Sequence, residues 1–167
     1  GGRLLGFLAS DCTTYIGTEP STKTFEGLER MKKDFSHIGK EVILHRMGSE
    51  EYQPEPNTLD LCFTSPPYFD TEKYADEETQ SFKKYPNRET WVNGFLKKTI
   101  ENCWNGLKEN KYMLINIANT PTNKWIEEQT ILTAKEVGFV YEKPIYLVLS
   151  SIAGKGQKLE PIFIFKK

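Results

Sequence analysis

The chain has 167 residues, which is enough for one domain of ordinary size and too few for a catalytic domain plus a second domain as large. Hydrophobic residues make up 38% and charged residues 27%, which excludes a disordered, collagen-like or coiled-coil chain and fits a globular α/β or α+β protein. The 22 Lys and Arg balance the 23 Asp and Glu to a formal net charge of -1, so any phosphate contact must come from a local patch or from a part of the protein outside this chain.

The first half of the sequence predicts two helices and three short strands. Apolar residues recur at helical spacing after the glycine pair Gly1-Gly2 and again over residues 22–35. Ser21 or Thr22 is expected to be the N-cap residue of the second helix. Short apolar runs predict strands at 15–18, 41–45 and 59–63. No strand is visible before the glycine pair, so a helix opens the chain.

The second half begins with a charged stretch, residues 69–88, that has no sustained period and predicts a long loop. Loops of this length in a compact domain are usually functional. Further patterns predict helices at 91–107 and 122–137 and strands at 112–117, 145–150 and 161–165. The turn at 153–157 is too short to hold a crossover helix, so the last strand should be antiparallel to its neighbour. The alternation predicts an α/β fold with a mostly parallel sheet and an antiparallel last strand.

Neither a metal site nor a membrane segment is expected. Cys12, Cys62 and Cys103 lie far apart and form no CxxC pair, and only two histidines are available. This pattern indicates reduced thiols rather than a zinc site. No apolar run approaches the roughly 18 residues that cross a bilayer, and the N-terminus lacks the layout of a secretory signal. We therefore expect a cytoplasmic protein.

The most informative stretch is Ser65-Pro66-Pro67-Tyr68, directly after the predicted strand 59–63. In an open α/β sheet ligands bind beyond the carboxyl ends of the strands, so these residues should lie at the functional edge. Two successive prolines fix the backbone and remove two N–H donors, which leaves rigid carbonyl acceptors. The serine hydroxyl adds an oxygen, and the tyrosine offers a flat face for stacking. Such a site suits an NH2 group on a planar heterocycle, because hydrogen bonds to its hydrogens would free the nitrogen lone pair for attack.

These four residues resemble the motif of the amino-group DNA methyltransferases, in which Asp, Asn or Ser is followed by Pro-Pro and an aromatic residue. Members of that family transfer a methyl group from S-adenosylmethionine to the exocyclic amine of cytosine or adenine. The resemblance implies a Rossmann-like methyltransferase fold for a single catalytic domain over residues 1–167. It implies that Ser65, Pro66, Pro67 and Tyr68 are catalytic. It also implies that the first strand of the fold is missing from the chain, which is expected to destabilise the sheet severely.

The resemblance further implies a cofactor site made from three places in the sequence. The glycine pair resembles the second half of a glycine-rich turn that holds the methionine part of the cofactor. The acidic residue after strand 15–18 occupies the place of a carboxylate that binds the ribose hydroxyls, and the polar residues after strand 41–45 occupy the place that meets the adenine. The cofactor-binding residues implied in this way are Gly1, Gly2, Glu19, Pro20, Ser49 and Glu50.

A site-specific DNA methyltransferase is the function that the resemblance implies. The target base would be flipped out of the duplex and stacked against Tyr68, with its amine bonded to Ser65 and to the Pro66 carbonyl. Cytosine and adenine both stay open as targets, and so does the biological setting, for which restriction-modification is one candidate. Recognition of the DNA sequence would come from the 69–90 loop, from the missing N-terminal part, or from a separate domain or subunit.

Two alternatives remain from the residues themselves. A guanine amine in RNA and a glutamine side chain in a protein also present an NH2 on a planar conjugated group, so the same motif could act on either. The second alternative is a catalytically silent methyltransferase-like subunit that binds nucleic acid or a catalytic partner, as the missing first strand allows.

Overall fold

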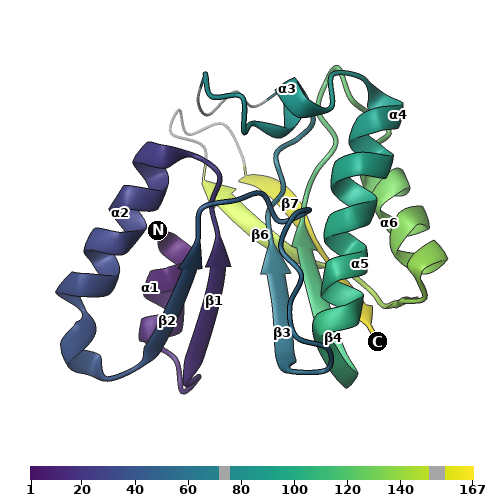
Figure 1. Ribbon diagram of the computed structural model, residues 1–167. Helices are drawn as coiled ribbons and strands as arrows, with labels where there is room; N and C mark the ends of the chain where they lie inside the picture. Colours follow the sequence, from purple (N-terminus) through teal and green to yellow (C-terminus); the bar gives the residue numbers. More distant parts are fainter. Residues whose placement is uncertain (72–75, 151–156) are drawn as a thin grey trace.

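Seven strands form two hydrogen-bonded sheets in the computed structural model, which describes residues 1–71, 76–150 and 157–167 (Figure 1). They are β1 (Thr14–Thr18), β2 (Glu41–His45), β3 (Leu59–Thr64), β4 (Leu107–Asn116), β5 (Val140–Tyr141), β6 (Ile145–Ser150) and β7 (Gln157–Lys166). β1 pairs in parallel with β2, and β3 pairs in parallel with β4. β7 is antiparallel to β4, β5 and β6. The antiparallel last strand that the sequence predicted is thereby confirmed, while most of the predicted turn at 153–157 lies outside the described residues.

The helices flank both sheets (Figure 1). They are α1 (Gly2–Leu8), α2 (Thr22–Asp34), α3 (Ser81–Lys84), α4 (Arg88–Thr90), α5 (Lys97–Gly106) and α6 (Ile126–Val137), with a 3-10 turn η1 (Ser36–Ile38) and a π-helical stretch η2 (Trp91–Leu96). α1 and α2 pack beside β1 and β2, whereas α5 and α6 pack on each other beside the larger sheet. No helix in the described part of the chain is long and apolar enough to span a membrane.

The helix predicted at 122–137 begins four residues later, at Ile126, because its leading residues form a turn. The Asn119 side chain accepts a hydrogen bond from the Glu127 backbone N–H at 3.1 Å, and the Glu127 carboxylate accepts one from the Asn119 N–H at 2.8 Å. This reciprocal pair satisfies an N–H of the first helical turn that has no partner within the helix. Apolar periodicity does not detect such a pair, so the sequence placed the start too early.

Among the described residues, β1 and β3 are not hydrogen-bonded to each other, and no strand lies between them in either sheet. β1 pairs with β2 alone, and β3 pairs with β4 alone. Figure 1 shows their arrows pointing the same way. The chain opens with α1, as the apolar spacing after the glycine pair predicted. On β3 the side chains of Leu61 and Phe63 are 56% and 45% exposed, and the Arg3 guanidinium of α1 lies 5.6 Å from the centre of the Phe63 ring. Arg3 therefore reaches from the first helix to the edge of the larger sheet.

Two separate hydrophobic clusters hold the fold. The larger one lies between α5, α6, η2 and the larger sheet, and its fully buried members include Trp91, Ile100, Met113 and Phe165. The smaller one joins α1 to β2 through Leu4, Phe7, Leu8 and Val42. Trp91, Trp104 and Trp125 all contribute to the larger cluster.

The N-terminus of α2 is capped by a residue far away in the sequence. Ser21 occupies the N-cap position, but its side chain makes no capping hydrogen bond. Instead both carboxylate oxygens of Glu77 accept from the Thr22 backbone N–H, at 3.0 and 3.2 Å, and one of them also accepts from the Thr22 hydroxyl at 2.9 Å. The predicted N-cap position of Ser21 is therefore confirmed, but a carboxylate from the 76–80 segment, and not the Ser21 side chain, satisfies the donor at the helix start.

Glu77→Gln is expected to destabilise the fold by about 1 kcal/mol, because the helix N-terminus loses a negative charge and a charge-assisted acceptor. Chemical denaturation of the variant and the wild type measures this difference. Glu78→Gln is the matched control, because this exposed neighbour pairs only with Lys83 on the surface. Equal stability of the Glu77 variant and the control would contradict the capping role.

Candidate functional site

Ser65, the first residue after β3, is hydrogen-bonded to the last residue of β4. The Ser65 hydroxyl donates to Asn116 Oδ1 at 3.2 Å. The two residues come together because Thr64 lies opposite Ile115 in the parallel register of these strands. Asn116 was not predicted as a site residue, although a lone polar residue at the end of an apolar strand is a signal that could have found it.

The proline pair leaves one carbonyl oxygen available beside Ser65. The Pro67 carbonyl accepts from the Phe69 N–H at 2.9 Å, and the Tyr68 carbonyl accepts from the Thr71 N–H at 3.2 Å. Among the hydrogen bonds of the described residues, none ends on the Pro66 carbonyl. The Ser65 hydroxyl oxygen and the Pro66 carbonyl are thus two acceptors that the motif can offer to a ligand.

Phe69 holds the end of this motif in an unusual backbone conformation. Its φ is 56°, in the left-handed region that bulky side chains rarely adopt. The ring is 9% exposed and packs edge-on against Trp91 and Trp125, with centroid distances of 5.8 and 5.9 Å. Packing of this kind can hold a strained residue in place, and strain of this kind clusters at functional sites. Sequence patterns do not indicate this conformation, because the left-handed region is not associated with phenylalanine.

A polar network ties the loop after β3 to the loop after β4. The Asn123 side chain, 6% exposed, donates to Asp70 Oδ1 at 2.9 Å and to the Thr71 hydroxyl at 3.2 Å. Thr71 also lies 3.3 Å from the Thr120 hydroxyl. Because both loops leave the carboxyl ends of neighbouring strands, this network fixes the edge of the sheet on which Ser65 lies.

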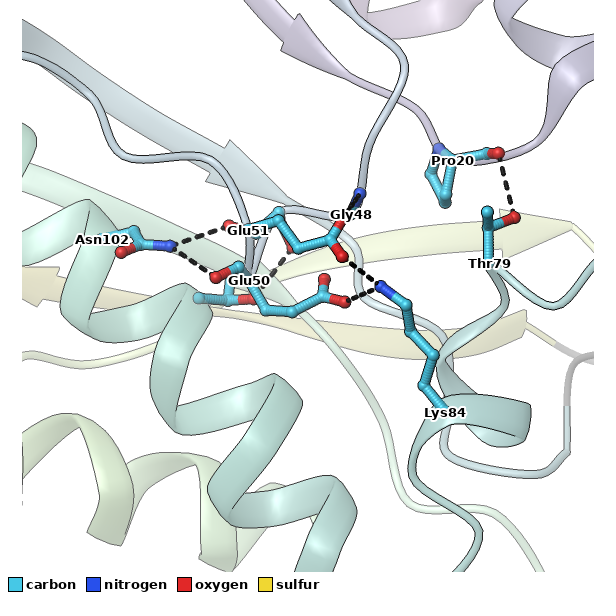
Figure 2. Close-up of polar contacts among 9 residues, drawn as sticks. Pro20, Gly48, Glu50, Glu51, Thr79, Lys84 and Asn102 are labelled. Carbon is cyan, nitrogen blue, oxygen red and sulfur yellow. Dashed lines mark hydrogen bonds and ion pairs between the residues drawn. The ribbon is translucent and has the colours of Figure 1, made fainter.

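Glu19 lies directly after β1 and is fixed through its backbone and its side chain. Its N–H donates to the His45 carbonyl at 3.0 Å, which extends the β1–β2 pairing by one residue. Its Oε1 accepts from the Ser21 N–H at 2.9 Å. The Pro20 carbonyl accepts from the Thr79 hydroxyl at 3.1 Å (Figure 2). The predicted acidic residue Glu19 thus lies at the carboxyl end of its strand. The 76–80 segment contacts the next residue, Pro20, through Thr79.

The loop after β2 packs on α5 through Ser49 and Asn102. The Ser49 hydroxyl lies 2.9 Å from the Thr99 hydroxyl. The Asn102 side chain donates to the carbonyls of Ser49 and Glu50, both at 3.1 Å (Figure 2). These contacts position the loop at the end of β2. The Ser49 hydroxyl is hydrogen-bonded to Thr99 and so helps to hold the loop on α5.

Glu50 presents a buried carboxylate oxygen that has no donor among the described residues. Its side chain is 3% exposed, and Lys84 Nζ lies 3.0 Å from Oε1 and 2.6 Å from Oε1 of the neighbouring Glu51 (Figure 2). The hydrogen bond from Lys84 lowers the pKa of Glu51. Glu50 Oε2 accepts no hydrogen bond. A buried oxygen without a donor costs free energy, so this atom is suited to accept a hydrogen bond from a bound molecule.

The glycine pair lies at the start of α1 and next to α2. A Cβ on Gly1 would lie 2.8 Å from the terminal methyl of Met31, whereas Gly2 has no neighbouring atom within 4 Å of its Cβ position.

The parallel strands β1 to β4 point their carboxyl ends the same way in Figure 1. Residues Glu19, Glu50, Ser65 and Asn116 therefore lie along one edge of the fold.

The cysteines and histidines form no metal site in the part of the chain that the structure describes. All three cysteines are free thiols. Cys62 and Cys103 are neighbours in space, and the hydrogen bond with Cys62, together with burial, raises the pKa of Cys103 well above its usual value. This pair was not expected from the sequence, where the two residues are far apart.

Comparison with solved structures identifies the fold. A SAM-dependent methyltransferase from Methanosarcina mazei matches with a TM-score of 0.65 and 11% identity, over 99% of this chain and 87% of that one. A protein from Pyrococcus horikoshii OT3 matches with a TM-score of 0.66 and 11% identity, over 99% and 76%. The YcgJ protein from Bacillus subtilis matches with a TM-score of 0.63 and 10% identity, over 100% and 88%. Neither protein-family models nor curated proteins gave a match. The chain thus has a Rossmann-like methyltransferase fold.

Proposed function

We propose that this protein transfers a methyl group from S-adenosylmethionine to an exocyclic amine of cytosine or adenine in DNA. The observation that carries the proposal is the pair of fixed acceptors at the carboxyl end of β3, the Ser65 hydroxyl and the Pro66 carbonyl. An exocyclic amine has two hydrogens to donate, and two acceptors at fixed positions can take both of them. The fold and the acidic residues on the same edge agree with this chemistry.

The residues after β1 and β2 fit the cofactor. Glu50 Oε2 is buried and without a donor, so it can accept a hydrogen bond from the amine of the cofactor adenine. Glu19 holds a carboxylate at the end of β1, where its second oxygen can accept from the ribose hydroxyls. The glycine pair at the start of α1 offers a surface without side chains to the methionine part. The cofactor supplies an electrophilic methyl group carried on a sulfonium.

The chain's own groups would activate the amine by position and electrostatics. When Ser65 and Pro66 accept its two hydrogens, the nitrogen lone pair is less delocalised into the ring and becomes a better nucleophile. Tyr68 would stack on the flipped base, which holds the nitrogen in line for attack. This scheme needs no covalent intermediate between enzyme and substrate.

Contact with the DNA backbone would come largely from outside the charged 76–90 segment. Lys83 pairs with Asp76 and Glu78, and Lys84 pairs with Glu50 and Glu51. The Arg88 guanidinium lies 4.4 Å from the centre of the Trp125 ring. Since these cations already have partners, we propose that a separate domain or subunit supplies the phosphate contacts.

Glu50→Gln is expected to weaken the binding of S-adenosylmethionine about tenfold or more. The Lys84 ammonium can only donate, so the new amide oxygen must face it and the amide NH2 takes the place of Oε2. That NH2 would then oppose the adenine amine. Titration calorimetry measures the change, and Glu51→Gln is the matched control, with affinity within about twofold of the wild type. Equal affinities of both variants would contradict the adenine contact.

A transfer assay with tritium-labelled S-adenosylmethionine tests the function. The acceptors are duplex DNA, total RNA and a mixture of proteins, each digested and analysed for the methylated product. We expect N4-methylcytosine or N6-methyladenine from the DNA, and Ser65→Ala serves as the inactive control. Label only in guanine of RNA or in glutamine of protein would reassign the substrate. Absence of cofactor binding in calorimetry would support a silent subunit instead.

A further inference from the structure

The amide group of Asn116 can adopt only one orientation in this structure. Its Nδ2 donates to the Pro161 carbonyl at 3.1 Å, and its Oδ1 faces the Ser65 hydroxyl at 3.2 Å. A carbonyl oxygen can only accept, so the NH2 of the amide must point toward Pro161. The amide oxygen therefore has to point toward Ser65.

The orientation of this amide fixes the direction of the Ser65 hydrogen bond as well. An amide oxygen cannot donate, so the Ser65 hydroxyl must donate its single hydrogen to Asn116 Oδ1. Only lone pairs then remain on the serine oxygen for a ligand. The 3.2 Å distance is long for an O–H···O bond, as is common for catalytic hydrogen bonds before a substrate is bound.

We infer that Asn116 is a positioning residue that makes Ser65 an obligate hydrogen-bond acceptor, and that the relay from Pro161 through Asn116 to Ser65 selects an NH2 substituent over an exocyclic oxo group at the same place on the base. The inference deepens the proposed function and rests on it. A base that presents an oxo group at this position would place two acceptors face to face, and the site would reject it. Cytosine and adenine would be accepted, whereas uracil and hypoxanthine would not.

The relay is built from three strands and is rigid for that reason. Ser65 follows β3, Asn116 ends β4, and Pro161 lies in β7. Asn116 lies opposite Ile162 in the antiparallel register, so its side chain reaches the carbonyl of the preceding residue. Pro161 is buried, which shields this hydrogen bond from water. The serine is thereby held by the larger sheet itself and not by a loop.

Binding of nucleosides that differ only in this substituent tests the inference. The probes are deoxycytidine against deoxyuridine and deoxyadenosine against deoxyinosine, measured by NMR titration with S-adenosylhomocysteine present. The wild type should prefer the amine member of at least one pair by about tenfold or more. In Asn116→Leu, which has nearly the same shape, the serine hydrogen is free to rotate toward an oxo group. The preference should then fall to about twofold or less.

Two further variants keep the test specific. Asn116→Asp retains an oxygen that accepts from Ser65, so this variant should keep the preference for the amine even if its thermal stability is lower. If Asn116→Leu does not fold, the aspartate variant is used in its place. Asn93→Leu removes an exposed asparagine of η2 and should change nothing. The inference is wrong if Asn116→Leu keeps the wild-type preference, or if the wild type shows none. If the wild type preferred the amine nucleosides but transferred no methyl group to DNA, the proposed function would be wrong and the inference about Asn116 would stand.

Discussion

Ser65→Ala is expected to lower kcat for methyl transfer by about 10²–10³-fold and to leave the affinity for S-adenosylmethionine within about twofold. The hydroxyl oxygen is one of the two acceptors for the substrate amine, so its loss weakens the interaction that grows as the nitrogen becomes tetrahedral. It makes no contact in the region of Glu19 and Glu50, where the cofactor would be held. Single-turnover kinetics and cofactor titration on the same preparation measure the two effects.

Two companion variants separate chemistry from general damage in that experiment. Tyr68→Ala should weaken both substrate binding and turnover, because the proposed stacking surface is lost. Ser36→Ala removes an exposed hydroxyl of η1 and should leave both quantities unchanged. If Ser65→Ala kept half of the wild-type turnover or more, the motif would have a structural role only and the assignment of the catalytic site would be wrong.

Trp91→Ala is expected to reduce the free energy of unfolding by about 3–5 kcal/mol. The side chain is fully buried and contacts three other rings, with centroids 5.4 Å away for Phe95, 5.8 Å for Phe69 and 6.0 Å for Trp125. Truncation leaves a cavity in the larger core and removes a support of Phe69, whose left-handed backbone directly follows the Ser65–Tyr68 motif. We therefore expect turnover to fall as well, even at temperatures where the variant is folded.

Urea denaturation followed by circular dichroism measures the stability change. Leu132→Ala on α6 is the control, because this side chain is 54% exposed and its loss should cost about 0.5 kcal/mol or less. A Trp91 variant as stable as this control would show that the aromatic cluster does not support the fold. A destabilised variant with full turnover would refute its role in holding Phe69.

Local sequence patterns predicted the longer helices and most of the strands, but not β5 or the start of β4 at Leu107, and they placed the Ser65–Tyr68 motif after β3. Helices such as α2 and strands such as β2 are visible because their apolar residues repeat with the period of the element. The Ser65–Tyr68 motif could be placed at a strand end because prolines cannot continue a ladder. Glu19 and Glu50 come after the predicted strands 15–18 and 41–45, and the family resemblance implied their place in a cofactor site.

What only the tertiary structure decided is the set of partners that these residues have. Asn116 and Pro161 stand 51 and 96 positions after Ser65 on the chain, yet strand register brings them into one hydrogen-bonded relay. Glu77 caps a helix, and Lys84 meets two carboxylates, through contacts between segments far apart in the sequence. Periodicity reports which face of an element is buried and says nothing of which elements become neighbours. The residue types and their local spacing thus determined the elements and the candidate chemistry, while packing between strands and loops determined hydrogen-bond direction, capping and backbone strain.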